Sequence, residues 1–175
     1  MHPAAPAPDE RPASVTRGAY AAAATALGQL LTTAGAVGLA TWTSPGERPG
    51  EDTAGAVVIV AWGLISAALL MVAAVTTLRR INGGRTLFTV VGIITLTNLA
   101  LCGIYYGIVG SEIVRLRGSD SPRPPTWTAL LGMTGAVLGL VAVIYGLVHY
   151  GRRTSRDWLK PPPPPVVYVP APPYR

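Results

Sequence analysis

The third of four apolar segments carries the side chains best suited to chemistry. Thr95, Asn98, Cys102 and Tyr105 follow one another at intervals of three, four and three residues, which places them on one face of an α-helix. An amide such as Asn98 near mid-bilayer must find a partner, because an unsatisfied polar group in lipid costs several kcal/mol. This face can form a polar path or ligand site, or it can bond to a neighbouring helix, with Gln29 as the partner. We favour the interhelical hydrogen bond, since one Asn and one Gln do not make a channel.

Two ionisable residues lie near the ends of the apolar segments. Glu112 follows Tyr105 by seven residues, and with nearby loop arginines it could serve an outer-surface enzyme site. His149 could titrate as a pH switch or cap its helix, and we favour the cap. His2, His149 and Cys102 are far apart, and no hydroxyl or thiol has a His and an acid near it. The sequence therefore predicts no catalytic residue, no cofactor and no metal site.

Small residues form a stripe along the fourth segment, at spacings of three and four that keep them on one helix face. Glycine lets membrane helices approach closely, because lipid provides no hydrophobic drive for their association. Shorter sets occur in the first and third segments. We expect these faces to pack helices together and, in the fourth segment, to bind a partner protein or a second copy. The set comprises Gly132, Gly135, Gly139, Ala142, Gly146, Gly103, Gly107, Gly28 and Gly35.

The fold class follows from where charge is missing. The windows 19–42, 54–78, 86–110 and 126–150 contain no Asp, Glu, Lys or Arg. A helix of such length spans about 36 Å, enough to cross a hydrocarbon core of ~30 Å. We therefore predict an all-α integral membrane protein, an antiparallel bundle of four transmembrane helices at about 19–42, 54–78, 86–113 and 126–150. With no carboxylate inside the membrane windows, coupled transport lacks its usual residue.

Basic residues predict the orientation. Ten lie in the two tails and the loop between the second and third helices, against four in the other two loops. The positive-inside rule then puts both termini in the cytoplasm. It also accounts for the net charge of +6, so nucleic acid is not an expected partner. The richness in Arg, Ala, Gly and Pro is typical of a GC-rich bacterial genome, so we expect the membrane to be a bacterial cell membrane. We expect lipid headgroups to contact Arg79, Arg80, Arg85, Arg152, Arg153 and Arg156.

The two ends of the chain lack apolar segments. Residues 1–18 are expected to be a disordered tail. Residues 151–175 form a basic stretch followed by a proline-rich one. Five consecutive prolines favour a stiff polyproline II rod, which is either a spacer or a docking peptide for a cytoplasmic partner. The candidate docking residues are Pro161, Pro162, Pro163, Pro164, Pro165, Tyr168 and Tyr174.

Three function classes are compatible with these features. The first and favoured one is a non-enzymatic accessory or assembly subunit that binds a membrane partner or associates with itself. The second is a small channel, permease or lysis-type pore that uses the polar face of the third helix. The third is an envelope or lipid enzyme with its site at Glu112.

Overall fold

The computed structural model describes residues 11–40, 51–81, 83–115 and 125–159, with only the backbone of 51–56, 113, 114 and 156. Four long helices make up most of it: α1 (Ala13–Ala40), α2 (Glu51–Leu78), α3 (Gly84–Arg115) and α4 (Thr126–Gly151). A short helix, α5 (Arg153–Trp158), follows α4. Each long helix is long and apolar enough to cross a membrane. This supports a multi-pass membrane protein.

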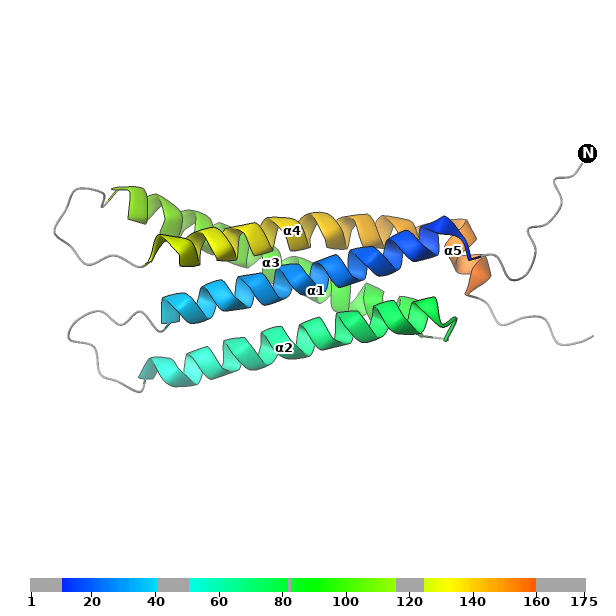
Figure 1. Ribbon diagram of the computed structural model, residues 1–175, viewed down its shortest axis with the longest axis horizontal. Helices are drawn as coiled ribbons and strands as arrows, with labels where there is room; N and C mark the ends of the chain where they lie inside the picture. Colours follow the sequence, from blue (N-terminus) through cyan, green and yellow to red (C-terminus); the bar gives the residue numbers. More distant parts are fainter. Residues whose placement is uncertain (1–10, 41–50, 82, 116–124, 160–175) are drawn as a thin grey trace, which may run out of the picture.

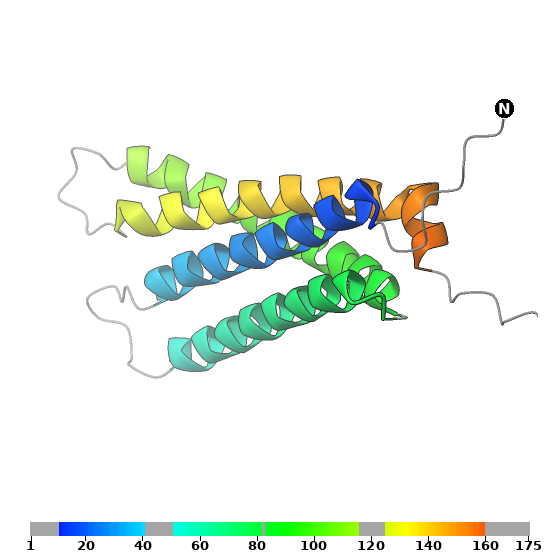
Figure 2. The same cartoon turned by 45° about the vertical axis from the view of Figure 1, so that its right-hand side comes forward.

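The long helices lie side by side, and the chain reverses direction between successive ones (Figure 1). In both ribbon views α1 lies between α4 and α2, while α3 passes behind α1 from the end of α2 towards the start of α4 (Figures 1 and 2). Among the long helices, α1 packs against α4 and α2, and α3 packs against α4 and α2, while α1 and α3 meet over a smaller area. We call the end where α1 and α3 begin, and α2 and α4 end, the cap end.

The first helix starts earlier than the sequence predicted. Residues 13–18 are helical and belong to α1, so the expectation of a disordered tail up to residue 18 is wrong for them. Pro12 accepts the first turn's hydrogen bond from the amide of Val15, at 2.9 Å. Gly18 packs against the ring of Tyr150 near the end of α4, where an added Cβ would be 2.9 Å from Cε1. The start of α1 thus packs against a distant part of the chain.

The last tail also contains unpredicted structure. Residues 153–158, expected to be part of an irregular tail, form α5. The proline-rich residues 160–175 and the other expected tail and loop residues, 1–10, 41–50 and 116–124, lie outside the described part of the chain.

The turn between α2 and α3 is tight. The amides of Arg80 and Ile81 bond to the carbonyl oxygens of Thr77 and Thr76, at 3.2 and 2.9 Å. This pairing is the Schellman pattern that ends many helices, with Arg80 where glycine is usual, at φ 57°. Gly83 also has a positive φ, of 100°, whereas Gly84 already belongs to α3.

The main apolar core lies in the half of the bundle nearest the cap end. Phe88 of α3 and Tyr150 of α4 are buried there, with their ring centroids 4.8 Å apart. Leu70 of α2 and Ala22 of α1 complete the four-helix contact. Towards the opposite end α3 leaves α2, and α3 is the least buried of the four spans.

Candidate functional site

The glycines of α1 and α4 meet each other inside the chain, in what we call the glycine seam. A Cβ on Gly28 would be 2.6 Å from the Cα of Gly139 and 2.7 Å from the carbonyl oxygen of Gly135. A Cβ on Gly35 would be 2.7 Å from the Cα of Gly132. Backbone therefore touches backbone. The face of α4 that we expected to bind a partner is already covered by α1 of the same molecule.

The flank of this stripe that faces α3 receives large side chains. Added Cβ atoms on Gly139 and Gly146 would meet Leu99 Cδ1 at 2.5 Å and Phe88 Cζ at 2.6 Å. Gly132 faces the ring of Tyr106 in the same way, and Ala142 is buried.

The glycines of α3 behave differently. Among the described residues, Gly103 has only the Cβ of Ala136 near it, at 3.6 Å, and no atom lies within 4 Å of an added Cβ on Gly107. The expectation that Gly107 packs a helix interface is wrong, because it faces away from its neighbours. A pair of glycines four residues apart says that a close approach is allowed, not that one occurs.

Two of the four predicted polar residues of α3, Asn98 and Cys102, line the same cavity as Gln29 of α1. Asn98 Nδ2 donates to Gln29 Oε1 at 3.4 Å, and Cys102 Sγ lies 4.0 Å from Asn98 Oδ1. Thr95 is buried, and no described residue pairs with its hydroxyl. The amide pair is the interhelical contact that the sequence suggested.

Tyr105 is not buried, and its neighbour Tyr106 takes the expected place. Tyr105 is 55% exposed, whereas Tyr106 is 1% exposed and donates from its hydroxyl to the carbonyl oxygen of Thr32 at 2.8 Å. Successive helix residues lie about 100° apart, so Tyr106, eleven residues after Thr95, returns to the same side, while Tyr105 falls about 80° away. The spacing of the polar residues alone does not separate the two tyrosines.

A cavity of about 270 Å³ opens beside the amide pair, between α1, α2 and α3. We call it the polar cleft. Its lining is mainly apolar, but Gln29, Asn98 and Cys102 supply polar atoms. Ala36 of α1, Trp62 of α2 and Tyr105 of α3 also line it.

At the cap end a hydrogen-bond cluster ties α5 to the start of α1. Ser155 is completely buried, and its Oγ lies 2.8 Å from Ser14 Oγ and 2.9 Å from the carbonyl oxygen of His149. Thr154 Oγ1 lies 3.2 Å from Ser14 Oγ. His149 is itself buried, and its Nδ1 lies 3.0 Å from the carbonyl oxygen of Tyr145 one turn earlier. The histidine thus contacts its own helix end.

Arg80 links α5 to the turn between α2 and α3. Its Nε donates to the carbonyl oxygen of Trp158 at 2.9 Å, and its guanidinium carbon lies 5.3 Å from the centroid of the Trp158 ring. Arg11 donates to the carbonyl oxygen of Leu78, at 3.1 Å. Two arginines near the ends of helices therefore bond to protein. Contact of the predicted arginines with lipid headgroups stays a prediction, and the side chain of Arg156 lies outside the described residues.

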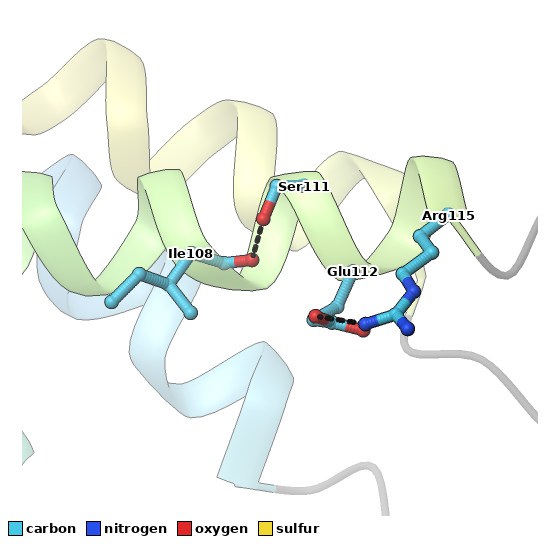
Figure 3. Close-up of polar contacts among 4 residues, drawn as sticks. All are labelled: Ile108, Ser111, Glu112 and Arg115. Carbon is cyan, nitrogen blue, oxygen red and sulfur yellow. Dashed lines mark hydrogen bonds and ion pairs between the residues drawn. The ribbon is translucent and has the colours of Figure 1, made fainter.

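Glu112 lies on the exposed surface of the last turns of α3. It pairs with Arg115 one turn later, with 3.6 Å between Oε1 and Nη1, and the two side chains are 53% and 80% exposed (Figure 3). Ser111 Oγ donates to the carbonyl oxygen of Ile108 at 2.7 Å. Such an exposed ion pair is a common helix-surface contact worth ~0–1 kcal/mol. It gives the carboxylate no special environment.

Within the described part of the chain, no group of three or more His, Cys, Asp or Glu side chains could hold a metal ion. No family model matches the sequence, and neither curated proteins nor solved structures show a significant similarity to it.

Proposed function

We propose that this protein is a non-enzymatic interaction subunit of a membrane complex, which presents its proline-rich tail to a cytoplasmic partner. The four long helices form the membrane anchor, an antiparallel bundle with both termini in the cytoplasm. The excess of basic residues at the cap end supports this orientation.

The anchoring of α5 is the observation that carries the proposal. The helix is held on one side by the Ser14–Ser155 contact and on the other by Arg80, which contacts both the carbonyl oxygen and the ring of Trp158. The residue after α5, Leu159, is also held, because its amide donates to the carbonyl oxygen of Ser155 at 3.2 Å. The base of the tail therefore lies beside α1, the end of α4 and the turn between α2 and α3.

A fixed base gives a proline-rich peptide a physical advantage. Binding an extended segment costs the entropy of ordering it, and consecutive prolines remove much of that cost beforehand. Five prolines begin two residues after Leu159. A peptide that is stiff and held at its base presents Tyr168 and Tyr174 over a restricted region near the membrane.

Site-specific photo-crosslinking in cells tests the proposal. A photoreactive amino acid is placed at Tyr168 in the tail and, as a control, at Ile144, an exposed position on α4. We expect one discrete crosslinked protein from position 168 and none from position 144. Replacing Pro161–Pro165 by a Gly-Ser sequence of equal length should abolish the product.

A second variant separates the tail from its anchor. Trp158→Ala leaves all five prolines intact but removes the ring that Arg80 contacts. We expect a weaker version of the same crosslink. A product from position 168 that survives loss of the prolines, or a discrete protein product from position 144 alone, would contradict the proposal.

A further inference from the structure

The polar cleft offers hydrogen-bond donors that no described residue uses. Gln29 is only 3% exposed, and its amide bonds to that of Asn98. Two primary amides carry four N–H donors between them, and their mutual hydrogen bond uses one. No described residue accepts a bond from the nitrogen of Gln29. A buried amide donor therefore borders an open cavity.

Two hydroxyl groups on the α1 side of the cavity are already engaged as donors. The hydroxyls of Thr32 and Thr33 donate to the carbonyl oxygens of Gly28 and Gln29, both at 2.8 Å. The thiol of Cys102 lies against Asn98. The amide N–H donors that are left over need an acceptor, which an occupant would supply on an otherwise apolar body.

The depth of the cleft along α3 and its volume narrow the choice of occupant. Asn98 lies near the middle of α3, which runs from Gly84 to Arg115. The ester carbonyls of a phospholipid lie at the edge of the hydrocarbon core, about 15 Å from its centre. A transmembrane helix is about 10 Å wide and would not fit a space of about 270 Å³. That volume is close to the lower end of the range for small-molecule sites, ~300–1,000 Å³.

We propose that the polar cleft binds the ring of an isoprenoid quinone, a lipid-soluble diketone that partitions into the hydrocarbon core. The Gln29–Asn98 amides donate to a ring carbonyl. Trp62 and Tyr105, 46% and 55% exposed at the edge of the cleft, offer aromatic faces to the planar ring. The isoprenoid chain leaves along Val58 and Ile59 on α2, both partly exposed. This inference concerns binding and does not depend on the proline-rich tail.

Fluorescence quenching tests it on the full-length protein in detergent, in a Cys102→Ala background that prevents addition of the thiol to the quinone. Menadione, a short naphthoquinone, is the probe. We expect saturable quenching that Trp62→Phe removes in large part, because Trp62 lines the cleft. The fused-ring hydrocarbon 2-methylnaphthalene lacks the carbonyl oxygens and should not compete at equal concentration.

Two substitutions test the donors and the space separately. Gln29→Leu removes the donor at similar volume and should weaken binding roughly threefold to tenfold, the value of one neutral hydrogen bond. Ala36→Phe should fill the cleft and abolish saturation. Its matched control is Ala68→Phe, in an apolar groove between α1 and α2 that also contains Leu27 and Leu64.

Thermal unfolding checks that each variant is folded before binding is compared. Saturable quenching that is unchanged in folded Gln29→Leu and Ala36→Phe protein would overturn the proposal. Equal competition by 2-methylnaphthalene would also overturn it, because it would show an apolar site that does not recognise a carbonyl. The absence of saturable quenching in the starting protein would have the same result.

Discussion

The two sides of α1 make opposite kinds of contact. Towards α4, Gly28 and Gly35 bring two backbones together and leave no room for even one additional carbon. Towards α2 and α3, the adjacent Gln29 pairs with Asn98 beside an open cavity. Glycines thus let two helix backbones touch because they have no side chain. A pair of amide side chains also joins two helices, but it keeps their backbones farther apart. The glycine seam fixes how closely α1 and α4 pack, whereas the polar cleft holds polar groups beside a cavity.

The largest expected effect compares a glycine in the seam with one outside it. Gly28→Ala would force a Cβ to within 2.6 Å of backbone in α4, which cannot move aside as a side chain can. We expect a loss of about 2–3 kcal/mol in the free energy of unfolding, measured by circular dichroism during SDS titration of mixed micelles.

Gly107→Ala is the matched control. No atom in the described part of the chain lies within 4 Å of the added Cβ, and alanine favours a helix over glycine. The variant should therefore be unchanged or more stable by up to about 1 kcal/mol. Equal losses at positions 28 and 107 would show that the seam is not where the helices meet.

Neighbouring tyrosines give the next largest contrast. Tyr106→Phe removes a buried hydroxyl that donates to Thr32 O, and we expect a loss of about 1–2 kcal/mol in the free energy of unfolding. Tyr105→Phe, at an exposed ring, should change it by less than about 0.5 kcal/mol. The same titration applies to both variants. A larger loss at Tyr105 would mean that α3 is rotated relative to the arrangement described.

The amide pair should show a smaller effect and measurable coupling. Asn98→Leu leaves Gln29 without its partner, and we expect a loss of about 1 kcal/mol. A double-mutant cycle with Gln29→Leu measures the interaction itself, which should be about 0.6–1.7 kcal/mol, because the double variant has no orphaned amide at this site. Strictly additive losses would show that the two side chains do not interact.

The smallest effect is expected outside both regions, at Glu112. Its ion pair with Arg115 is exposed, so Glu112→Gln should reduce the free energy of unfolding by less than about 0.5 kcal/mol. Cell growth and envelope composition, assayed beside a Glu112→Ala variant, should also be unchanged. A marked loss in both variants would favour the alternative of an envelope or lipid enzyme.

Some features of the fold could be predicted from short stretches of sequence, and others could not. Charge-free windows predicted four apolar helices, because one buried charge would exclude a membrane span wherever its neighbours lie. The spacing of Asn98 and Cys102 predicted a polar face for the same local reason. Which of Tyr105 and Tyr106 is buried depends on how α3 is rotated against α1 and α4. A pattern of four polar residues does not define that rotation closely enough to decide between neighbouring positions.

The two ends of the chain show what local patterns cannot supply. The start of α1 and the whole of α5 are ordered by contacts such as Ser14 with Ser155, which are distant in sequence. Ser, Thr and Arg there look like any soluble tail. Which glycines meet is a similar case, since Gly107 and Gly139 are equivalent by type and only the arrangement of the helices separates them.

The glycine seam also has a consequence for how the protein is made. It joins the first long helix to the last, so α1 enters the bilayer before its closest neighbour has been synthesised. During that interval the backbone around Gly28 and Gly35 faces lipid or the insertion machinery. The final topology closes only when α4 arrives, and the contact of Ser155 with Ser14 follows later still. A nascent chain that stops before Thr126 would leave the glycine face of α1 without the helix that covers it.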